Sequence, residues 1–218
     1  MRRKLRRNSK ARDEYLFPRR LTTFWGLSTL ATATISLLYL SQWYAPLGVD
    51  LLVYYIFSAL SQSGLFLLPA LLVGLLLGGR TIRRERVAFF VFLVYSILLN
   101  AILLLDWQVY KLFRFHINGM VLALATGPGA DEVFSFDPWL WGQAFAVLAC
   151  LVLLAYAVRT IAFRLGYLPK GRIPIALWLI VSILAHGGHA IAAGMGNSSI
   201  QELSALLRST TPFGLTAC

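Results

Sequence analysis

Residues 106–126 read DWQVYKLFRFHINGMVLALAT, and this stretch decides how the rest of the chain is arranged. Its charged and polar side chains lie between two long runs that have the hydropathy of membrane spans: Asp106, Lys111, Arg114, His116 and Asn118. A charged side chain deep in lipid costs about 2.5 kcal/mol or more. We therefore expect these residues to lie at a membrane interface or to face a cavity lined by protein.

The rest of the chain is strongly apolar. Of its 218 residues, 58% are hydrophobic and 13% are charged, and the mean hydropathy of +0.71 lies outside the usual range of a soluble domain. Each apolar run is close to the length of about 20 residues that crosses the hydrocarbon core of a bilayer. The runs cover residues 21–43, 51–78, 87–105, 138–163 and 173–194. We predict an all-α integral membrane protein with five transmembrane helices in residues 21–194.

The basic residues indicate how the predicted spans are oriented. Of the 20 Lys and Arg residues, nine lie in residues 1–20, four in residues 80–86 and four in residues 159–172. Five spans put these three segments on one side, and the positive-inside rule makes that side cytoplasmic. The N-terminus is then cytoplasmic and the C-terminus faces outward. This arrangement explains the net charge of +11 without nucleic acid as a partner.

Two of these basic segments are candidates for contacts on the cytoplasmic side. Residues 1–20 either set the topology or also bind anionic lipid or a cytoplasmic protein, since each juxtamembrane cation adds about 1 kcal/mol of attraction to an anionic surface. The other candidates are arginines near the loop after the second run: Arg80, Arg83, Arg84 and Arg86. Both interpretations of the basic segments stay open at this point.

The segment between the third and fourth runs is too long for a tight turn and too apolar for a free linker. Residues 107–126 place apolar side chains along one helical face and are followed by Gly127-Pro128-Gly129, a strong signal for the end of a helix. We predict an interfacial or re-entrant helix over residues 107–126, with its apolar side in the outer leaflet.

The polar residues of this predicted helix form the candidate binding site. We expect Lys111, Arg114, His116 and Asn118 to meet lipid phosphates while neighbouring phenylalanines insert among acyl chains. The alternative is structural, because Asp106 can form an ion pair with Arg114 or Lys111 and thereby tie the interfacial helix to the third span.

No catalytic or metal site is expected from the sequence. GxSxG, HExxH and Walker A motifs are absent. His186 and His189 can share a helix face, but no third ligand lies near them in sequence, so we expect neither a metal nor another cofactor. The alternative function is an integral membrane enzyme or a small transporter, with a polar site among the spans formed by Asn100, Asp106, Arg114, His116, His186 and His189. The lack of matching halves argues against a transporter built from inverted repeats.

The run LLLDWQVYKLFRFHINGMVLAL, residues 103–124, and the tail TTPFGLTA, residues 210–217, resemble the membrane domain of the YejM (PbgA) inner-membrane family. Members of that family carry a five-span N-terminal domain followed by a periplasmic globular domain of the alkaline phosphatase and sulfatase superfamily. The resemblance implies a protein of the Gram-negative inner membrane with a cytoplasmic N-terminus and a periplasmic C-terminus. Residues 195–218 are then expected to be a periplasmic tail that begins a linker to a globular domain absent from this sequence.

The resemblance also implies a function in envelope lipid homeostasis. In relatives, the membrane domain is linked to cardiolipin and lipopolysaccharide binding and to regulation through a protein on the cytoplasmic side. For this chain we expect a non-catalytic inner-membrane anchor that binds phospholipid, cardiolipin or lipopolysaccharide, or a partner protein. The hydrolase-like chemistry of the globular domain does not carry over to the membrane domain.

Overall fold

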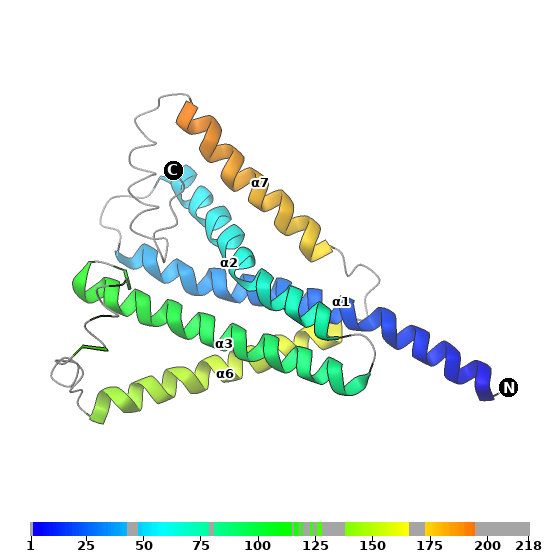
Figure 1. The fold of residues 1–218 in the computed structure, drawn as a ribbon. Helices are drawn as coiled ribbons and strands as arrows, with labels where there is room; N and C mark the ends of the chain where they lie inside the picture. Colours follow the sequence, from blue (N-terminus) through cyan, green and yellow to red (C-terminus); the bar gives the residue numbers. More distant parts are fainter. Residues whose placement is uncertain are drawn as a thin grey trace.

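The computed structural model describes residues 2–42, 48–78, 81–114, 116–117, 119, 123, 126–127, 138–165 and 173–194. Throughout these residues the regular structure is helical, with no strand. The elements are α1 (Arg2–Ser36), the 3-10 helix η1 (Leu37–Gln42), α2 (Val49–Leu77), α3 (Ile82–Phe113), α6 (Pro138–Leu165) and α7 (Ile173–Gly194). In Figure 1, α1, α3 and α6 run alongside one another, while α2 and α7 pair with each other and slant across α1.

The basic N-terminal segment is helical and continuous with the first predicted span. α1 begins at Arg2 and is 35 residues long, with Pro18 inside it. The part of this helix and η1 that is apolar enough for a span is Leu16–Gln42. Because Arg and Lys favour helix nearly as well as Leu does, the predicted boundary at residue 20 marks a change in composition and not in secondary structure.

The buried core forms where α1, α2, α3 and α6 meet. On α1, Phe17, Leu21, Phe24 and Trp25 recur at helical spacing and are almost fully buried. Phe24 contacts Phe92 of α3, with 4.7 Å between the ring centroids. An apolar stripe at this spacing is what packs one helix against its neighbours.

Contacts along α1 and α3 show that these two helices run in the same direction. The contacts advance together from Phe24–Phe92 to Tyr39–Asp106. Figure 1 shows α2 and α6 running in the opposite direction to both. The bundle therefore has two ends, which we name the Asp106 end and the Arg83 end.

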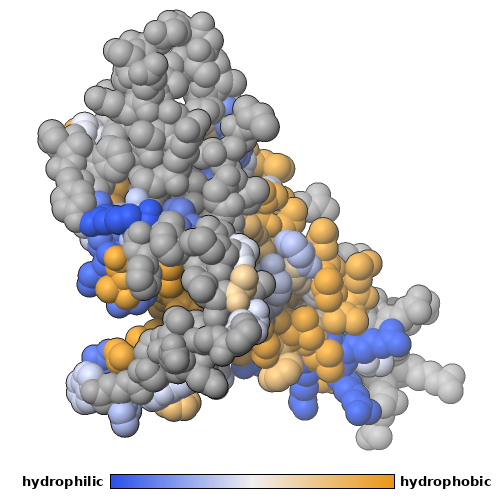
Figure 2. Space-filling view, turned by 60° about the vertical axis from the view of Figure 1, so that its left-hand side comes forward, coloured by the Kyte–Doolittle hydropathy of each residue, from blue (hydrophilic) through white to orange (hydrophobic). Residues whose placement is uncertain are grey.

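Among the described residues, four helices are long and apolar enough to cross a membrane. They contain the segments Leu16–Gln42, Leu52–Leu77, Ile82–Leu112 and Pro138–Leu165. Large hydrophobic side chains are exposed along α2, α3, α6 and α7, and Figure 2 shows hydrophobic surface between hydrophilic patches. Soluble proteins rarely expose apolar surface on this scale, so the described part of the chain has the build of a membrane protein.

The fifth predicted span coincides with α7, which has 22 residues. Its described apolar part is the shorter segment Pro174–Gly187, which falls below the length that the other four helices reach. A fifth span therefore stays a prediction. The predicted tail, residues 195–218, lies outside the described residues.

The third helix continues past the predicted end of the third span. α3 runs to Phe113, so the predicted start of a separate interfacial helix at residue 107 is wrong. The reason is that Asp106 is completely buried and receives its hydrogen bonds from protein donors, so the helix continues through it. Beyond Arg114, the structure describes residues 116–117, 119, 123 and 126–127 of the predicted helix, and the remaining positions lie outside the described residues.

Helices α2 and α7 approach each other closely at Gly64. A methyl group at this position would lie 2.0 Å from Trp178 Nε1, so the indole would have to move. The indole is held in place because its N–H donates a hydrogen bond to Ser61 O at 3.0 Å and its ring packs edge-on against Trp25. The missing side chain at Gly64 thus leaves the space that the Trp178 indole fills.

We predict that Gly64→Ala lowers the stability of the bundle by about 1–3 kcal/mol, the usual cost of overpacking a close contact. Thermal unfolding in mild detergent, followed by circular dichroism, measures the change. The matched control is Gly142→Ala in α6, where an added methyl group meets nothing within 4 Å. The control should be neutral or slightly stabilising because Ala favours helix over Gly. Equal effects of the two substitutions would contradict the packing of α2 on α7.

Candidate functional site

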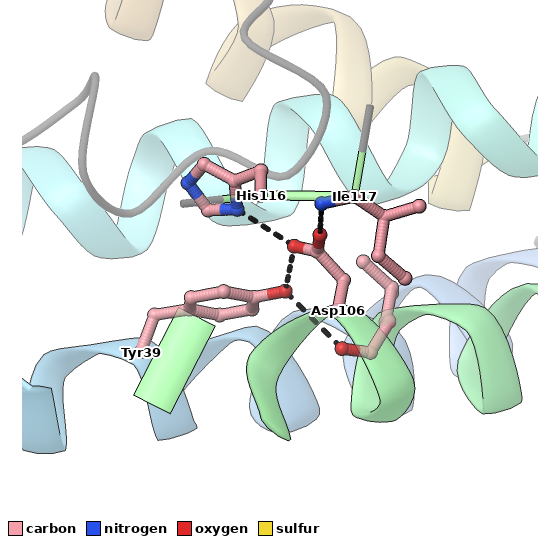
Figure 3. A network of polar contacts seen from close by, with 5 residues as sticks. Tyr39, Asp106, His116 and Ile117 are labelled. Atoms are coloured by element: carbon pink, nitrogen blue, oxygen red, sulfur yellow. Dashed lines mark hydrogen bonds and ion pairs between the residues drawn. The ribbon is translucent and has the colours of Figure 1, made fainter. Parts of the chain in front are cut away.

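The Asp106 end of the bundle holds a buried carboxylate. Asp106 lies in α3 and is 0% exposed. Its Oδ2 accepts a hydrogen bond from Tyr39 Oη at 2.5 Å and lies 2.7 Å from His116 Nδ1, and its Oδ1 accepts from the backbone N–H of Ile117 at 2.6 Å. Figure 3 shows these partners converging on the carboxylate. The three contacts compensate for the water that the carboxylate has lost. We name these four residues the Asp106 cluster.

Tyr39 brings η1 into this cluster. Its hydroxyl oxygen lies 2.5 Å from Asp106 Oδ2 and 3.1 Å from Leu103 O. A hydroxyl has one proton to donate, so the shorter contact to the charged acceptor is the stronger hydrogen bond. The end of α1 and η1 is therefore fastened to α3 through a side chain that is 1% exposed.

His116 is oriented by both packing and hydrogen bonding. Its ring stacks on Tyr110, with 4.7 Å between centroids and an angle of 16°, and it also packs against Tyr39. Nδ1 faces Asp106 and forms an ion pair with it when the imidazole is protonated. Nε2 is buried and has no hydrogen-bond partner among the described residues. The structure thus places this histidine inside the cluster, with 14% of its side chain exposed.

Arg114 ends α3 and turns the chain. It adopts a left-handed conformation with φ 62°, and its backbone N–H donates to Tyr110 O at 2.9 Å. This helix-ending turn brings the following residues back over Asp106. In the structure Asp106 lies 2.7 Å from His116 Nδ1, and Arg114 Nη1 donates to Gln42 O at 3.4 Å.

Two predicted lipid-binding cations are exposed beside the cluster. Lys111 lies in the last turn of α3 and Arg114 directly follows that helix. Lys111 Nζ lies 5.5 Å from the centroid of the Trp107 ring, a cation–π contact, and the Trp107 indole N–H donates to Leu38 O at 3.0 Å. Asn118, the remaining predicted residue of this group, lies outside the described residues.

A groove of about 480 Å³ lies between α3 and α6 at the same end of the bundle. Trp107 lines this groove and also contacts Lys111, so the groove lies next to an exposed cation. Most of its wall is aliphatic, and two carboxamide side chains add polarity. Its lining includes Leu104, Trp107 and Gln108 of α3 and Gln143, Ala144 and Leu148 of α6.

The arginines predicted to make cytoplasmic contacts lie at the opposite end of the bundle. Arg83 and Arg84 line a hollow of about 490 Å³ together with aliphatic residues of α2 and α3. Arg86 is exposed in the same first turns of α3. Arg80 lies outside the described residues. The described arginines therefore form an exposed basic surface with an apolar wall.

The residues predicted to form an intramembrane polar site make separate contacts in different parts of the bundle. Ser61 Oγ of α2 lies 3.3 Å from His186 Nε2 and 3.0 Å from Ser182 Oγ, both in α7. Within the part of the chain that the structure describes, no hydrogen bond or ion pair joins His186 to Asp106. The serines and His186 therefore connect α2 to α7, whereas Asp106 connects η1 to α3.

The remaining candidates do not complete such a site. Asn100 is buried in α3, donates to Ser96 O at 2.9 Å, and has an Oδ1 without a hydrogen-bond partner among the described residues. His189 belongs to α7, but its side chain lies outside the described residues. Over the described ranges, no three His, Cys, Asp or Glu side chains come together in a group that could hold a metal.

The fold and these contacts define an all-helical protein of the membrane type, with a buried polar cluster at one end and exposed cations at both ends. A family model described as a domain of unknown function, DUF3413, matches residues 19–207. The chain belongs to this family. The match extends from within α1 to beyond α7, so it includes the Asp106 cluster and the groove. Searches of curated proteins and of solved structures each find no match.

Tyr39 is the side chain of the cluster that sequence reasoning missed; Ile117, which was also not predicted, contributes only its backbone N–H. Tyr39 lies at the end of the first apolar run, where an aromatic residue is typical of a membrane interface. Its partner Asp106 is 67 residues away, and no local pattern connects the two. The available signal was Asp106 itself, because an acid in an apolar helix needs a donor from another element.

We predict that Tyr39→Phe lowers stability by about 1–3 kcal/mol, because the buried carboxylate then lacks one donor. Thermal unfolding in mild detergent measures the loss. Tyr156→Phe is the matched control, since this tyrosine is 59% exposed on α6 and an exposed substitution changes stability by no more than about 0.5 kcal/mol. A Tyr39→Phe protein as stable as the wild type would mean that the hydroxyl is not needed to satisfy Asp106.

Proposed function

We propose that this chain is a non-catalytic membrane domain that anchors its protein in a bacterial inner membrane and binds phospholipid at the Asp106 end. The observation that carries the proposal is the position of Lys111 and Arg114. Both are exposed where α3 ends, and that end is held in place by the buried Asp106 cluster.

The proposal assigns a topology to the bundle. α7 is the fifth span, the Arg83 end faces the cytoplasm and the Asp106 end faces the periplasm. The support is the charge distribution, since nine of the 20 basic residues lie in residues 1–20 and two groups of four lie in residues 80–86 and 159–172. These positions agree with the positive-inside rule for five spans.

The chemistry at the Asp106 end suits a lipid phosphate. An ammonium or guanidinium group makes charge-assisted hydrogen bonds to phosphate oxygens. The cation–π contact with Trp107 restrains Lys111, which lowers the entropy that the side chain loses on binding. Tryptophan is also typical of the depth at which headgroups lie.

The resemblance of residues 103–124 to the YejM (PbgA) family supports a function in envelope lipid homeostasis. Under this proposal the bound lipid is a phospholipid such as cardiolipin, or lipopolysaccharide. The hollow at Arg83 and Arg84 is the proposed contact for a regulatory protein on the cytoplasmic side, because it combines two exposed cations with an apolar wall.

We predict that Lys111→Ala/Arg114→Ala loses phospholipid that the wild-type chain retains. Charge-assisted hydrogen bonds contribute about 1.5–3 kcal/mol each, so losing both should reduce retention at least about tenfold. Native mass spectrometry of protein released from mild detergent, with phosphatidylglycerol or cardiolipin added, measures the bound lipid directly.

The matched control for this experiment is Lys111→Arg/Arg114→Lys, which keeps both charges. It should retain lipid nearly as well as the wild type, and the alanine variant should keep its unfolding temperature. Equal loss of lipid and of stability in the alanine variant would favour a structural role for the two cations. A wild-type chain that retains no lipid would refute the proposal.

We also predict that a reporter enzyme active only in the periplasm will be active when it is fused after Cys218 and inactive when it is fused near Arg83. A reporter active only in the cytoplasm should give the opposite pattern. The reverse result at either position would rule out five spans with a cytoplasmic N-terminus.

A further inference from the structure

We propose that the groove between α3 and α6 holds an acyl chain of a glycerophospholipid from the periplasmic leaflet, with the phosphate at Lys111 and the ester carbonyls at Gln108 and Gln143. This inference rests on the proposed function for the orientation of the bundle, and it deepens that function by naming the lipid class and its site. It concerns a different surface from the basic hollow at the Arg83 end.

The groove exists because α6 packs on the bundle through only part of its length. Residues 141–150 of α6 are all exposed. The buried residues of this helix are Leu151, Ala155 and Ala162, none of which comes before the middle of the helix. Figure 1 shows α3 and α6 separating toward the end at which α6 begins. In a membrane, a wedge of this kind fills with apolar chains because water is excluded from it.

The size and lining of the groove fit an acyl chain. Its volume of about 480 Å³ lies within the range of about 300–1,000 Å³ that is typical of small-molecule sites. Leu104 of α3 and Leu148 of α6 line it together with other aliphatic side chains. Contact with such walls favours a flexible hydrocarbon chain over a rigid polar ligand.

Two carboxamides point to the part of the lipid that joins the chain to the headgroup. Gln108 and Gln143 come from opposite walls of the groove, and neither has a hydrogen-bond partner within the described residues. A polar group next to lipid is costly without a partner. Each carboxamide has two N–H donors, and the ester carbonyl oxygens of a glycerophospholipid are acceptors at the matching depth.

The charge at the rim of the groove selects an anionic headgroup. Lys111 lies over the Trp107 ring, and Trp107 lines the groove. The ammonium group is therefore separated from the groove only by the Trp107 indole. None of the described residues that line the groove is acidic. A phosphodiester is the group of a membrane lipid that pairs with this cation.

The test fills the groove and leaves the cations in place. Ala144 lines the groove, whereas Ala146 is exposed on the same helix and does not line it. We expect Ala144→Leu to reduce retained phosphatidylglycerol about tenfold in native mass spectrometry and Ala146→Leu to leave it unchanged. Gln143→Leu, which keeps the volume and removes the donors, should reduce retention several-fold and serves as the test if Ala144→Leu fails to fold.

The outcomes separate this inference from the proposed function. If Ala144→Leu and Gln143→Leu retain as much lipid as the wild type while Lys111→Ala/Arg114→Ala loses it, the lipid binds to surface cations and the groove inference is overturned. If Ala144→Leu instead changes the oligomeric mass without affecting lipid, a helix of another chain occupies the groove and the inference is again overturned. If the wild type retains no phosphatidylglycerol or cardiolipin, both proposals fail.

Discussion

The Asp106 end of the molecule depends on how one buried carboxylate is satisfied. An ionised carboxylate that is fully removed from water costs several kcal/mol unless donors surround it, and Asp106 is 0% exposed. Its contacts come from Tyr39 in η1 and from His116 and Ile117 beyond α3. η1 and the residues after α3 must therefore both pack against α3 for the carboxylate to keep its hydrogen bonds. The carboxylate thereby determines where α1 ends relative to α3 and where the chain goes after Arg114.

This constraint also decides which polar residues are buried at this end of the bundle and which are exposed. Asp106 and His116 have the chemistry of a catalytic or ligand-binding pair, but the structure uses them to hold three segments together. Lys111 and Arg114 are exposed next to them. The hydrogen bonds from Tyr39 and Ile117 to Asp106 position the end of α3, where the two cations lie. The cluster thus has a structural role, and under the proposed function lipid binds at the exposed surface next to it.

Helix boundaries that follow an apolar run could be predicted from the sequence, and boundaries set by long-range contacts could not. The predicted runs 138–163 and 173–194 nearly coincide with α6 (Pro138–Leu165) and α7 (Ile173–Gly194), because the ends of a continuous apolar segment are visible in the sequence. The end of α3 was misplaced, since Asp106 resembles a boundary residue until Tyr39 is known to bury it. For the site, composition identified His116 and Arg114, but the left-handed turn at Arg114 decided which of them pairs with Asp106.

The apolar groove between α3 and α6 must be interpreted differently in a membrane protein than in a soluble one. A soluble protein that exposed ten consecutive residues of an apolar helix, as residues 141–150 are exposed here, would bury them by association. In a bilayer, lipid chains cover an exposed apolar helix face, so exposure alone does not indicate a specific binding site. Gln108 and Gln143 change the argument, since hydrocarbon cannot satisfy the carboxamides that both helices place in the same groove. An occupant with acceptors at one end and an apolar body at the other meets both requirements, and a membrane lipid has that form.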